Sequence, residues 1–245
     1  MPKEVISVAI TTYKAPKGAL LRCLKSLETQ TFQDFRVHLY LDGADEMLDA
    51  ESADLIGRYK WVVYRDGENR GIGARLNFLH KQCAGEFIAW QGSDDVSLPD
   101  RFQKQVDFLR ANPAIMAISG QVLQIRENGK QNILQGFSTD PALCMERYRR
   151  GATGCPSICL MFRKELAVIP LREGLRVAED TAWGMEVAKK FYPQAVHMNL
   201  PDVIAHYHRS GNSATRQYRR DMEAGKVPAF GDVDRALAKE IWGDV

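Results

Sequence analysis

The stretch that most constrains the fold is residues 85–102, where a short apolar run ends in two adjacent acids. Phe87–Trp90 is apolar, partly aromatic and too short for a helix, which predicts a buried strand. Ser97 is expected to cap the helix that follows. Asp94 and Asp95 should therefore lie in a strand-to-helix loop at the carboxyl edge of a sheet, where open α/β sheets bind ligands.

Two adjacent carboxylates predict either a cation site or a simple turn. Neighbouring acids repel, and each makes the ionisation of the other more costly unless a cation or hydrogen-bond donors lie between them. A magnesium or manganese ion held by one or two carboxylates relieves this repulsion and keeps positions open for water and phosphate oxygens. The alternative is a polar turn ahead of a helix cap, and this stretch alone leaves both open.

Strand-like and helix-like segments alternate through the first half of the chain. The expected strands are Val5–Thr11, Val37–Leu41, Trp61–Tyr64 and Phe87–Trp90, and the expected helices carry apolar residues at Leu20, Cys23, Leu24 and Leu27 and at Ile72, Leu76, Leu79 and Cys83. Such alternation predicts an α/β fold with a mostly parallel sheet and helices on its faces.

The second half is less regular. Its expected strands are Ile115–Ile125, Ile133–Phe137 after a turn at 127–130, Ile158–Phe162 and a last one between Ala195 and Tyr207; its expected helices are Met145–Arg150, Ala182–Phe191 and one through Val233, Leu237 and Ile241. The basic segment that ends at Arg220 is either a solvated tail or a clamp on phosphate.

Composition narrows the class of protein. With 245 residues, 45% hydrophobic residues and a net charge of +2, we expect one large domain, or one domain with a small appendage, that does not bind nucleic acid. No apolar run is long enough to cross a bilayer, and only Lys3 precedes the first apolar run, so we expect an unexported, cytoplasmic protein. The five cysteines fit a reducing compartment and lack the spacing of a zinc site.

Several motifs, in this order, resemble the family-2 glycosyltransferases over about residues 4–210. They are Ile10-Thr-Thr-Tyr followed by Arg22-Cys-Leu, Asp42-Gly-Ala, Asn69-Arg-Gly with Ala74-Arg-Leu-Asn, the acidic stretch 85–102, and Glu179-Asp-Thr-Ala-Trp. The resemblance implies a single GT-A domain: a mostly parallel central sheet flanked by helices, with a Rossmann-like N-terminal half and a less regular, acceptor-binding C-terminal half. It implies a nucleotide-sugar-binding half at 1–110, an acceptor half at 111–215 and a C-terminal tail or helix at 216–245.

The resemblance also implies how a nucleotide-sugar donor is bound. Thr11 and Tyr13 would meet the base, with the Tyr13 ring packed on it, and Asp42 would accept from a base N–H. Arg75 would reach toward base or phosphate. The alternatives are that Asp42 only stabilises its turn and that Arg75 is a surface arginine with its stem packed on the sheet.

A divalent ion, Mn2+ or Mg2+, is implied as the cofactor. Asp94 and Asp95 would hold ribose and the ion, which neutralises the charge that grows on the diphosphate leaving group. His206 or His208 resembles a late metal ligand, although each could be structural. The two are expected on opposite faces of a strand, so that at most one faces the site. The chain departs from the family pattern at two positions. Many members carry an acid where this chain has Gly92, and an acid often precedes the Asp-Gly turn where this chain has Leu41.

The acceptor side rests on Asp180 and Glu179. Asp180 resembles the base that takes the proton of an alcohol acceptor, and Glu179 a secondary acceptor residue. The alternative for Asp180 is a helix N-cap. Trp183 is either a core residue or a platform for the acceptor sugar, and the segment 209–220 is a candidate lid over the bound donor.

Together these features predict an inverting hexosyl- or N-acetylhexosaminyl-transferase. It would use a nucleotide diphosphate donor, expected to be uridine-based, and a glycan or lipid-linked acceptor in surface polysaccharide synthesis. Peripheral contact with the inner face of the membrane and a homo-oligomer are both compatible with that role. One alternative is an inactive GT-A-like module that acts with a partner enzyme, suggested by Gly92. A nucleotidyltransferase ranks last, because Thr11–Gly18 is not a basic, glycine-rich loop.

Overall fold

The strands described in the computed structural model form one nine-stranded sheet, in the order β3-β2-β1-β4-β8-β6-β9-β5 with β7 paired to β6. The structure describes residues 4–43, 48–209 and 214–243. β1 pairs in parallel with β2 and β4, and β2 with β3. β8 runs antiparallel to β4 and β6, so the C-terminal half joins the same sheet as the N-terminal half.

The first half is the expected run of strands and helices. Its elements are β1 (Ile6–Thr12), α1 (Ala19–Glu28), β2 (Phe35–Leu41), α2 (Ala50–Tyr59), β3 (Val62–Arg65), α3 (Gly71–Gln82) and β4 (Phe87–Gly92). α2 was not predicted, because its apolar contribution to the core is limited to the adjacent pair Leu55 and Ile56. Two adjacent apolar residues do not make a helical period.

The second half adds shorter elements. They are β5 (Val96–Ser97), α4 (Arg101–Ala111), β6 (Ala117–Arg126), β7 (Gln131–Ile133), α5 (Pro141–Arg149), η1 (Ser157–Cys159), β8 (Met161–Arg163), η2 (Lys164–Val168), α6 (Glu179–Phe191), β9 (His197–Arg209), α7 (Ala214–Glu223) and α8 (Phe230–Trp242). The hairpin at 127–130 is confirmed, since β6 and β7 pair antiparallel around it.

Three expectations for this half are wrong in detail. Ser97 does not cap a helix: it lies in β5, and its hydroxyl donates to Gln91 Oε1 at 2.6 Å, while α4 begins four residues later. The strand expected at Ile158–Phe162 is divided into the 3-10 turn η1 and β8. The strand expected at Ile133–Phe137 is the shorter β7, which ends at Ile133. The boundary expected at 215/216 lies within the range of α7, and the division of the chain stays a prediction.

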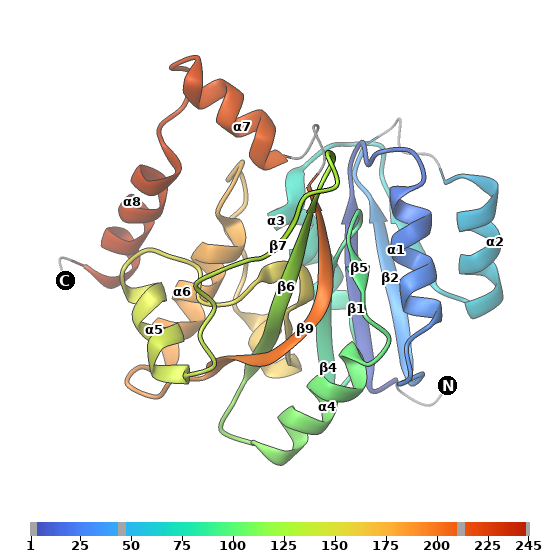
Figure 1. Ribbon diagram of the computed structural model, residues 1–245, viewed down its shortest axis with the longest axis horizontal. Helices are drawn as coiled ribbons and strands as arrows, with labels where there is room; N and C mark the ends of the chain where they lie inside the picture. Colours follow the sequence, from blue (N-terminus) through green and yellow to red (C-terminus); the bar gives the residue numbers. More distant parts are fainter. Residues whose placement is uncertain (1–3, 44–47, 210–213, 244–245) are drawn as a thin grey trace.

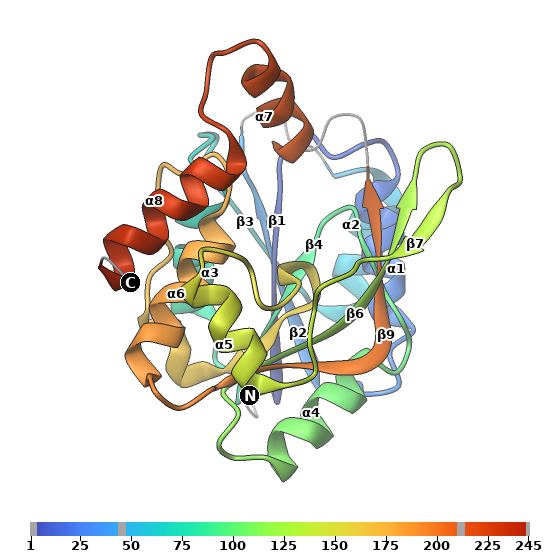
Figure 2. The same cartoon turned by 60° about the vertical axis from the view of Figure 1, so that its left-hand side comes forward.

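Helices cover both faces of the sheet (Figure 1). On one face α1, α2 and α4 pack on the strands in a core that includes Leu24 and Phe102. On the other face α3 and α6 contribute Leu79 and Trp183 to a second core. α5, α6 and α8 enclose a third cluster, and α7 lies on the side of the molecule toward which the carboxyl ends of the parallel strands point (Figures 1 and 2).

The carboxyl ends of three parallel strands meet at this edge. In the sheet register Thr12 of β1 lies opposite Leu41 of β2, and Thr11 lies opposite Gly92 of β4. The loops that leave β1, β2 and β4 therefore emerge side by side, and they carry most of the donor-side residues predicted from the sequence.

Candidate functional site

The loop after β4 is braced by hydrogen bonds from its neighbours. The guanidinium of Arg22 donates to the Asp94 carbonyl at 3.0 Å, and the Cys23 thiol donates to the Gly92 carbonyl at 3.3 Å. The Gln91 amide donates to the carbonyls of Gly92 and Asp95 at 3.0 and 3.2 Å. The backbone that presents the two acids is thus set by α1 and β4 together.

The Asp95 carboxylate is buried and tied to the last strand. Its Oδ1 accepts from the backbone N–H of His208 at 2.9 Å, and the residue is 1% exposed. Its Oδ2 folds back over Gly92, where an added Cβ would lie 2.1 Å from it. The space that a side chain at position 92 would need is therefore filled by Asp95.

The electrostatics of this loop fit a divalent cation. Burial raises the pKa of Asp94, and burial together with the charge of Asp94 raises the pKa of Asp95 well above its usual value. The Asp94 carboxylate accepts a hydrogen bond from no other described residue. A hard cation would stabilise two acids that resist ionisation, and the unpartnered Asp94 carboxylate is the candidate ligand.

The histidines of β9 do not lie on opposite faces, because residues two apart on a continuous strand share a face. The charge of His206 indeed lowers the pKa of His208, after burial and Arg22. A neutral imidazole is the form that binds metal, but no cluster of three or more acidic, histidine or cysteine side chains suited to a metal occurs among residues 4–43, 48–209 and 214–243. His208 is the nearer candidate, since its backbone is bonded to Asp95.

Asp42 and Arg75 face each other in a buried ion pair. Arg75 Nε donates to Asp42 Oδ1 at 2.6 Å, and both residues are 3% exposed. The other donors of Arg75 reach the Tyr40 hydroxyl, both carboxylate oxygens of Asp66 and the Glu68 carbonyl. All five N–H groups of Arg75 are therefore occupied. The alternative of a surface arginine is wrong, because Arg75 is buried, and the contact of Arg75 with base or phosphate stays a prediction.

Asp42 also closes the amino end of α3. Its Oδ1 accepts from Arg70 N–H at 3.0 Å and its Oδ2 from Gly71 N–H at 2.9 Å, so the turn-stabilising role is present. A carboxylate has about four acceptor positions. One position on Oδ2 stays unused by the described residues.

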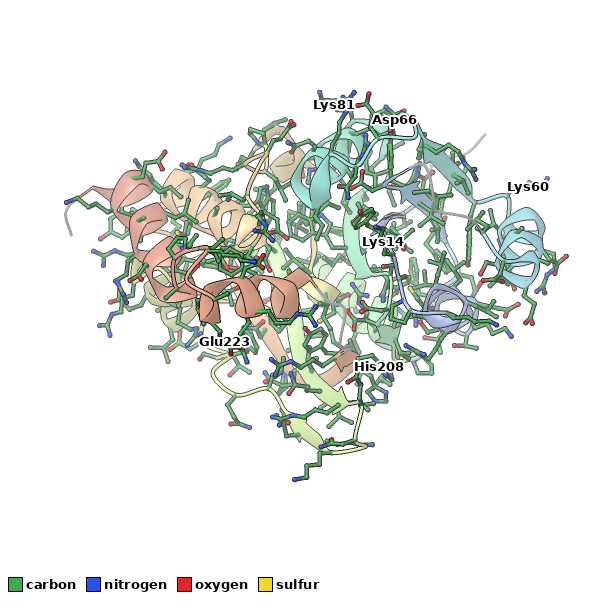
Figure 3. All side chains as sticks on the ribbon, turned by 90° about the horizontal axis from the view of Figure 1, so that it is seen from above. Lys14, Lys60, Asp66, Lys81, His208 and Glu223 are labelled. Carbon is green, nitrogen blue, oxygen red and sulfur yellow. The ribbon has the colours of Figure 1, made fainter. Side chains whose placement is uncertain are left out.

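Tyr13 lies beside this turn and is exposed. A Cβ at Gly43 would meet the Tyr13 ring at 3.2 Å, and a hydrogen bond with Asn69 lowers the pKa of Tyr13. The Lys14 ammonium lies 5.1 Å from the ring centre. Lys14 and His208 are both seen from above the carboxyl edge (Figure 3). Thr11 is part of β1, beside Gly92.

Glu179 and Asp180 form the first turn of α6 instead of preceding it. The N-cap is Ala178 in a left-handed conformation, so the N-cap role for Asp180 is wrong. Asp180 Oδ1 accepts from Thr181 N–H at 2.7 Å, while Oδ2 accepts from no described residue. Burial and the Asp180 charge raise the pKa of Glu179 to about 8.

Trp183 of α6 and Tyr207 of β9 have surroundings that the local sequence did not reveal. Trp183 is 1% exposed, packs on Trp90 and Phe162, and donates to the Ile169 carbonyl at 2.9 Å, so it is a core residue and not an acceptor platform. Tyr207 was not singled out. Its position between two histidines on a strand was the available signal.

A fully buried arginine lies beneath the acidic loop. Arg101 donates to Gln91 Oε1 at 2.6 Å, to the Ser97 hydroxyl at 2.8 Å and to the Trp90 carbonyl at 2.8 Å. Burial lowers its pKa to about 10, and the charge of Asp95 partly offsets this. Arg101 positions the strand from which the acids emerge.

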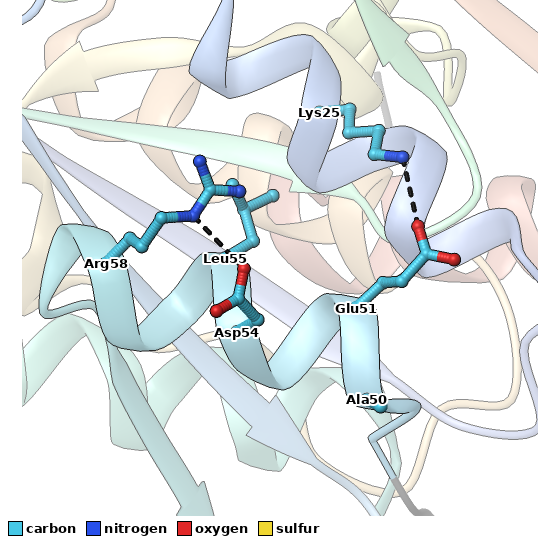
Figure 4. A pocket seen from close by; sticks show the side chains of 6 residues that line it. All are labelled: Lys25, Ala50, Glu51, Asp54, Leu55 and Arg58. Carbon is cyan, nitrogen blue, oxygen red and sulfur yellow. Dashed lines mark hydrogen bonds and ion pairs between the residues drawn. The ribbon is translucent and has the colours of Figure 1, made fainter.

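A separate hollow of about 350 Å3 lies between α1 and α2 (Figure 4). It is lined by Lys25, Ala50, Glu51, Asp54, Leu55 and Arg58. Its charges pair with each other, Lys25 with Glu51 and Arg58 with Asp54, both at 3.2 Å. None of the predicted site residues contributes to it.

Known proteins share this combination of motifs and sheet. The family model for glycosyl transferase family 2 matches residues 7–168. The chain belongs to glycosyl transferase family 2. The amylovoran biosynthesis glycosyltransferase AmsE of Erwinia amylovora is 27% identical to it over 206 residues, which cover 82% of this chain and 74% of AmsE.

Two solved structures resemble this glycosyltransferase in fold. TarS of S. aureus in complex with UDP-GlcNAc superposes with a TM-score of 0.68 at 18% identity, covering 97% of this chain and 71% of that one. The mannosyltransferase PcManGT of Pyrobaculum calidifontis, in complex with GDP-Man and Mn2+, gives a TM-score of 0.61 at 13% identity, covering 98% and 74%. The predicted single-domain GT-A fold is confirmed. No helix among the described residues is long and apolar enough to cross a membrane.

Proposed function

We propose that this glycosyltransferase is metal-dependent and inverting, and that it moves one sugar from a uridine diphosphate donor to a glycan or lipid-linked acceptor. The observation that carries the proposal is the pair Asp94 and Asp95, two acids with raised pKa values at the carboxyl end of β4. A bound Mn2+ or Mg2+ would act as a Lewis acid on the diphosphate leaving group. Asp94 would hold that ion.

The acceptor side would supply the base. Asp180 keeps its Oδ2 without a partner among the described residues, while Oδ1 is held by Thr181. That oxygen would accept the proton of the acceptor hydroxyl as the oxygen attacks the anomeric carbon from the side opposite the diphosphate. Glu179, whose pKa of about 8 keeps it neutral at neutral pH, would add no second negative charge beside Asp180.

A uridine donor is supported by the number of hydrogen-bond acceptor positions that remain on the Asp42 carboxylate. Three of its acceptor positions are taken by Arg70, Gly71 and Arg75, and one remains. Uracil presents a single ring N–H, which one acceptor position satisfies. Guanine presents two adjacent donors that require both carboxylate oxygens. Tyr13, exposed beside Gly43, would pack on the base.

The acceptor class is supported by similarity alone. AmsE is described as an enzyme of amylovoran biosynthesis. We infer a role in surface polysaccharide synthesis at the cytoplasmic side of a membrane, with transfer of a hexose or N-acetylhexosamine. The candidate lid 209–220 overlaps α7, which lies on the side of the molecule toward which the carboxyl ends of the parallel strands point (Figures 1 and 2), and this position suits a lid.

The test begins with a thermal-shift panel of nucleotide diphosphates and their sugars, with and without Mn2+. Binding to the folded state raises the melting temperature, and we expect UDP with Mn2+ to do so and GDP to do so less. Asp180→Asn should lower kcat by about 100- to 10,000-fold and leave UDP binding intact. Asp54→Asn, a surface acid on α2, is the control.

A second candidate is a module that binds nucleotide without catalysis. It is suggested by Gly92, which leaves the loop one carboxylate short of the family pattern. UDP binding by a wild type that shows neither transfer nor donor hydrolysis would favour it. A wild type that binds no nucleotide diphosphate would exclude both candidates.

A further inference from the structure

Two of the five free cysteines meet where the turn after α5 folds back on that helix. Cys144 belongs to α5, and Cys155 lies in the loop between α5 and η1. An added Cβ on Gly154 would lie 2.8 Å from the Cys144 carbonyl oxygen. The residue before Cys155 therefore touches the backbone of Cys144, and the two cysteines are within reach of each other.

Neighbouring residues of β9 hold the two thiols. Asn199 Nδ2 donates to Cys144 Sγ at 3.4 Å and to the Gly154 carbonyl at 2.9 Å. The Cys155 thiol lies 3.5 Å from the Met198 carbonyl, to which it donates. The thiols of Cys144 and Cys155 also form a hydrogen bond with each other. The two sulfur atoms are therefore neighbours without a residue between them.

The ionisation of Cys144 differs from that of the other cysteines. The hydrogen bond with Cys155 lowers the pKa of Cys144 and outweighs the opposing effect of burial. The charge of Arg147 and the amide of Asn199 lower this pKa further. Burial raises the pKa of the other four thiols, which are Cys23, Cys83, Cys155 and Cys159. Because the thiolate is the nucleophile in thiol chemistry, Cys144 is the thiol that reacts first.

The position of Cys144 in a short surface helix allows an oxidant to reach it. Cys144 lies in the first turn of the nine-residue α5, where the helix dipole favours a thiolate. Cys144 is 0% exposed and Cys155 is 2% exposed, so the reaction requires a local opening. The preceding residue Leu143 is 55% exposed, which places α5 at the protein surface. Short surface elements open locally at a lower free energy than the core.

Cys159 is nearer to Cys155 in the sequence, but its thiol has other contacts. Its Sγ is hydrogen-bonded to the Ser119 hydroxyl at 3.0 Å, and that hydroxyl donates to the Pro156 carbonyl at 2.8 Å. Cys144, in contrast, has its thiol hydrogen-bonded to that of Cys155. The structure therefore favours Cys144 as the partner of Cys155, which the sequence spacing does not.

We propose that Cys144 and Cys155 form a reversible disulfide when the protein meets hydrogen peroxide. The Cys144 thiolate attacks a peroxide oxygen: an S–O bond forms, the O–O bond breaks, and the leaving hydroxide takes up a proton to become water. The Cys155 sulfur then attacks the sulfenic acid: the S–S bond forms, the S–O bond breaks, and the hydroxide leaves with the thiol proton as a second water. The thiols are oxidised and the peroxide is reduced to water.

Such a bond suits a reducing compartment, where disulfides are transient and sense oxidants. It ties α5 to the loop that follows it and is independent of the proposed function. A dithiol such as dithiothreitol reverses it by thiol–disulfide exchange.

The test uses the full chain, reduced with dithiothreitol, freed of the reductant and treated with hydrogen peroxide. Peptide mapping by mass spectrometry without reduction should show Cys144 linked to Cys155, and thiol titration should show the loss of two of the five thiols. Dithiothreitol should restore both. Cys144→Ser should remove the linked peptide and slow the loss of thiols by about 10-fold or more. Cys83→Ser, which removes another buried cysteine, is the matched control and should leave the linked peptide unchanged.

The order of the two steps is tested by Cys155→Ser. This variant should stop at a sulfenic acid on Cys144 that dimedone labels, and a label on another cysteine instead would overturn the assignment of the attacking thiol.

The wild-type peptide map requires no variant, so a serine variant that misfolds does not affect it. A link between Cys155 and Cys159, a link between two copies of the chain, or five thiols that persist until urea unfolds the protein would each overturn the inference. All three results would leave the proposed function standing, because the test does not involve UDP binding or sugar transfer.

Discussion

Gly92 and Asp95 share one volume: a Cβ on Gly92 would lie 2.1 Å from Asp95 Oδ2. The absence of an acid at position 92 is thus matched by the folded-back carboxylate of Asp95, which also bonds the last strand through His208. The acid that the family motif has at position 92 is missing here, and the Asp95 carboxylate occupies the space that its side chain would need. Gly92 therefore gives weaker support to an inactive module than the sequence alone suggests.

Gly92→Ala should displace the Asp95 carboxylate and cost about 1–3 kcal/mol of stability, the usual range for overpacking a core position. The same change in an Asp95→Ala background should cost much less, because the clash is gone. A double-mutant cycle by urea unfolding measures this coupling. Gly57→Ala, where an added Cβ meets nothing within 4 Å, is the control and should be neutral or stabilising. If the stability costs of Gly92→Ala and Asp95→Ala simply added in the double mutant, the claim that the two positions share one volume would be contradicted.

Arg75→Met should destabilise the protein by about 3–5 kcal/mol, because it leaves the buried Asp42 carboxylate without its cation. Arg75→Lys should recover little of the lost stability, since one ammonium group cannot replace the five N–H donors of the guanidinium group. Chemical denaturation measures both, with Arg58→Met as the surface control. Unchanged stability combined with weaker UDP binding would instead show that Arg75 contacts the donor directly.

Asp94→Asn and Asp95→Asn should affect metal binding unequally. Asp94 is the proposed direct ligand, so its loss should weaken Mn2+ binding in the presence of UDP by at least about 10-fold more than the loss of Asp95. Asn at position 95 can still accept from His208 N–H. Calorimetric Mn2+ titration measures the difference, with Asp107→Asn on α4 as the control. A larger effect from Asp95→Asn would reverse the assignment of the two acids.

Glu179 should make stability fall as pH rises. Its pKa is about 4.5 when unfolded and about 8 in the folded protein, so between these values the unfolded chain releases a proton that the folded chain keeps. The contribution of Glu179 is therefore most favourable below about pH 4.5 and is lost progressively up to about pH 8. Glu179→Gln should flatten this part of the pH profile in urea unfolding at pH 5.5 to 8.5. An unchanged slope in the variant would assign the dependence to other groups.

The alternation of elements and the placement of the donor-side acids followed from the sequence. Apolar period and segment length identify β1, β2, β4 and α1 locally, and in a parallel sheet the ends of such strands meet at one edge. Asp42 follows β2 directly, and Asp94 and Asp95 follow β4 after Ser93, so their common edge required no long-range information. The sequence of α7 was interpreted only as a basic segment, because it is rich in charged residues and shows no helical repeat of apolar residues.

The tertiary structure decided what each side chain contacts. Arg75 turns inward because Asp42 and Asp66 lie within reach of α3, and Trp183 is buried because Trp90 and Phe162 line the facing strands. The end of β9 is placed by its pairing with β6 and by the hydrogen bond from His208 N–H to Asp95. These partners are 9 to 113 residues away in the chain, so no local pattern encodes them. The sequence determined which chemical groups the protein carries at its sheet edge, and only the packing of distant segments determined which of those groups face a ligand.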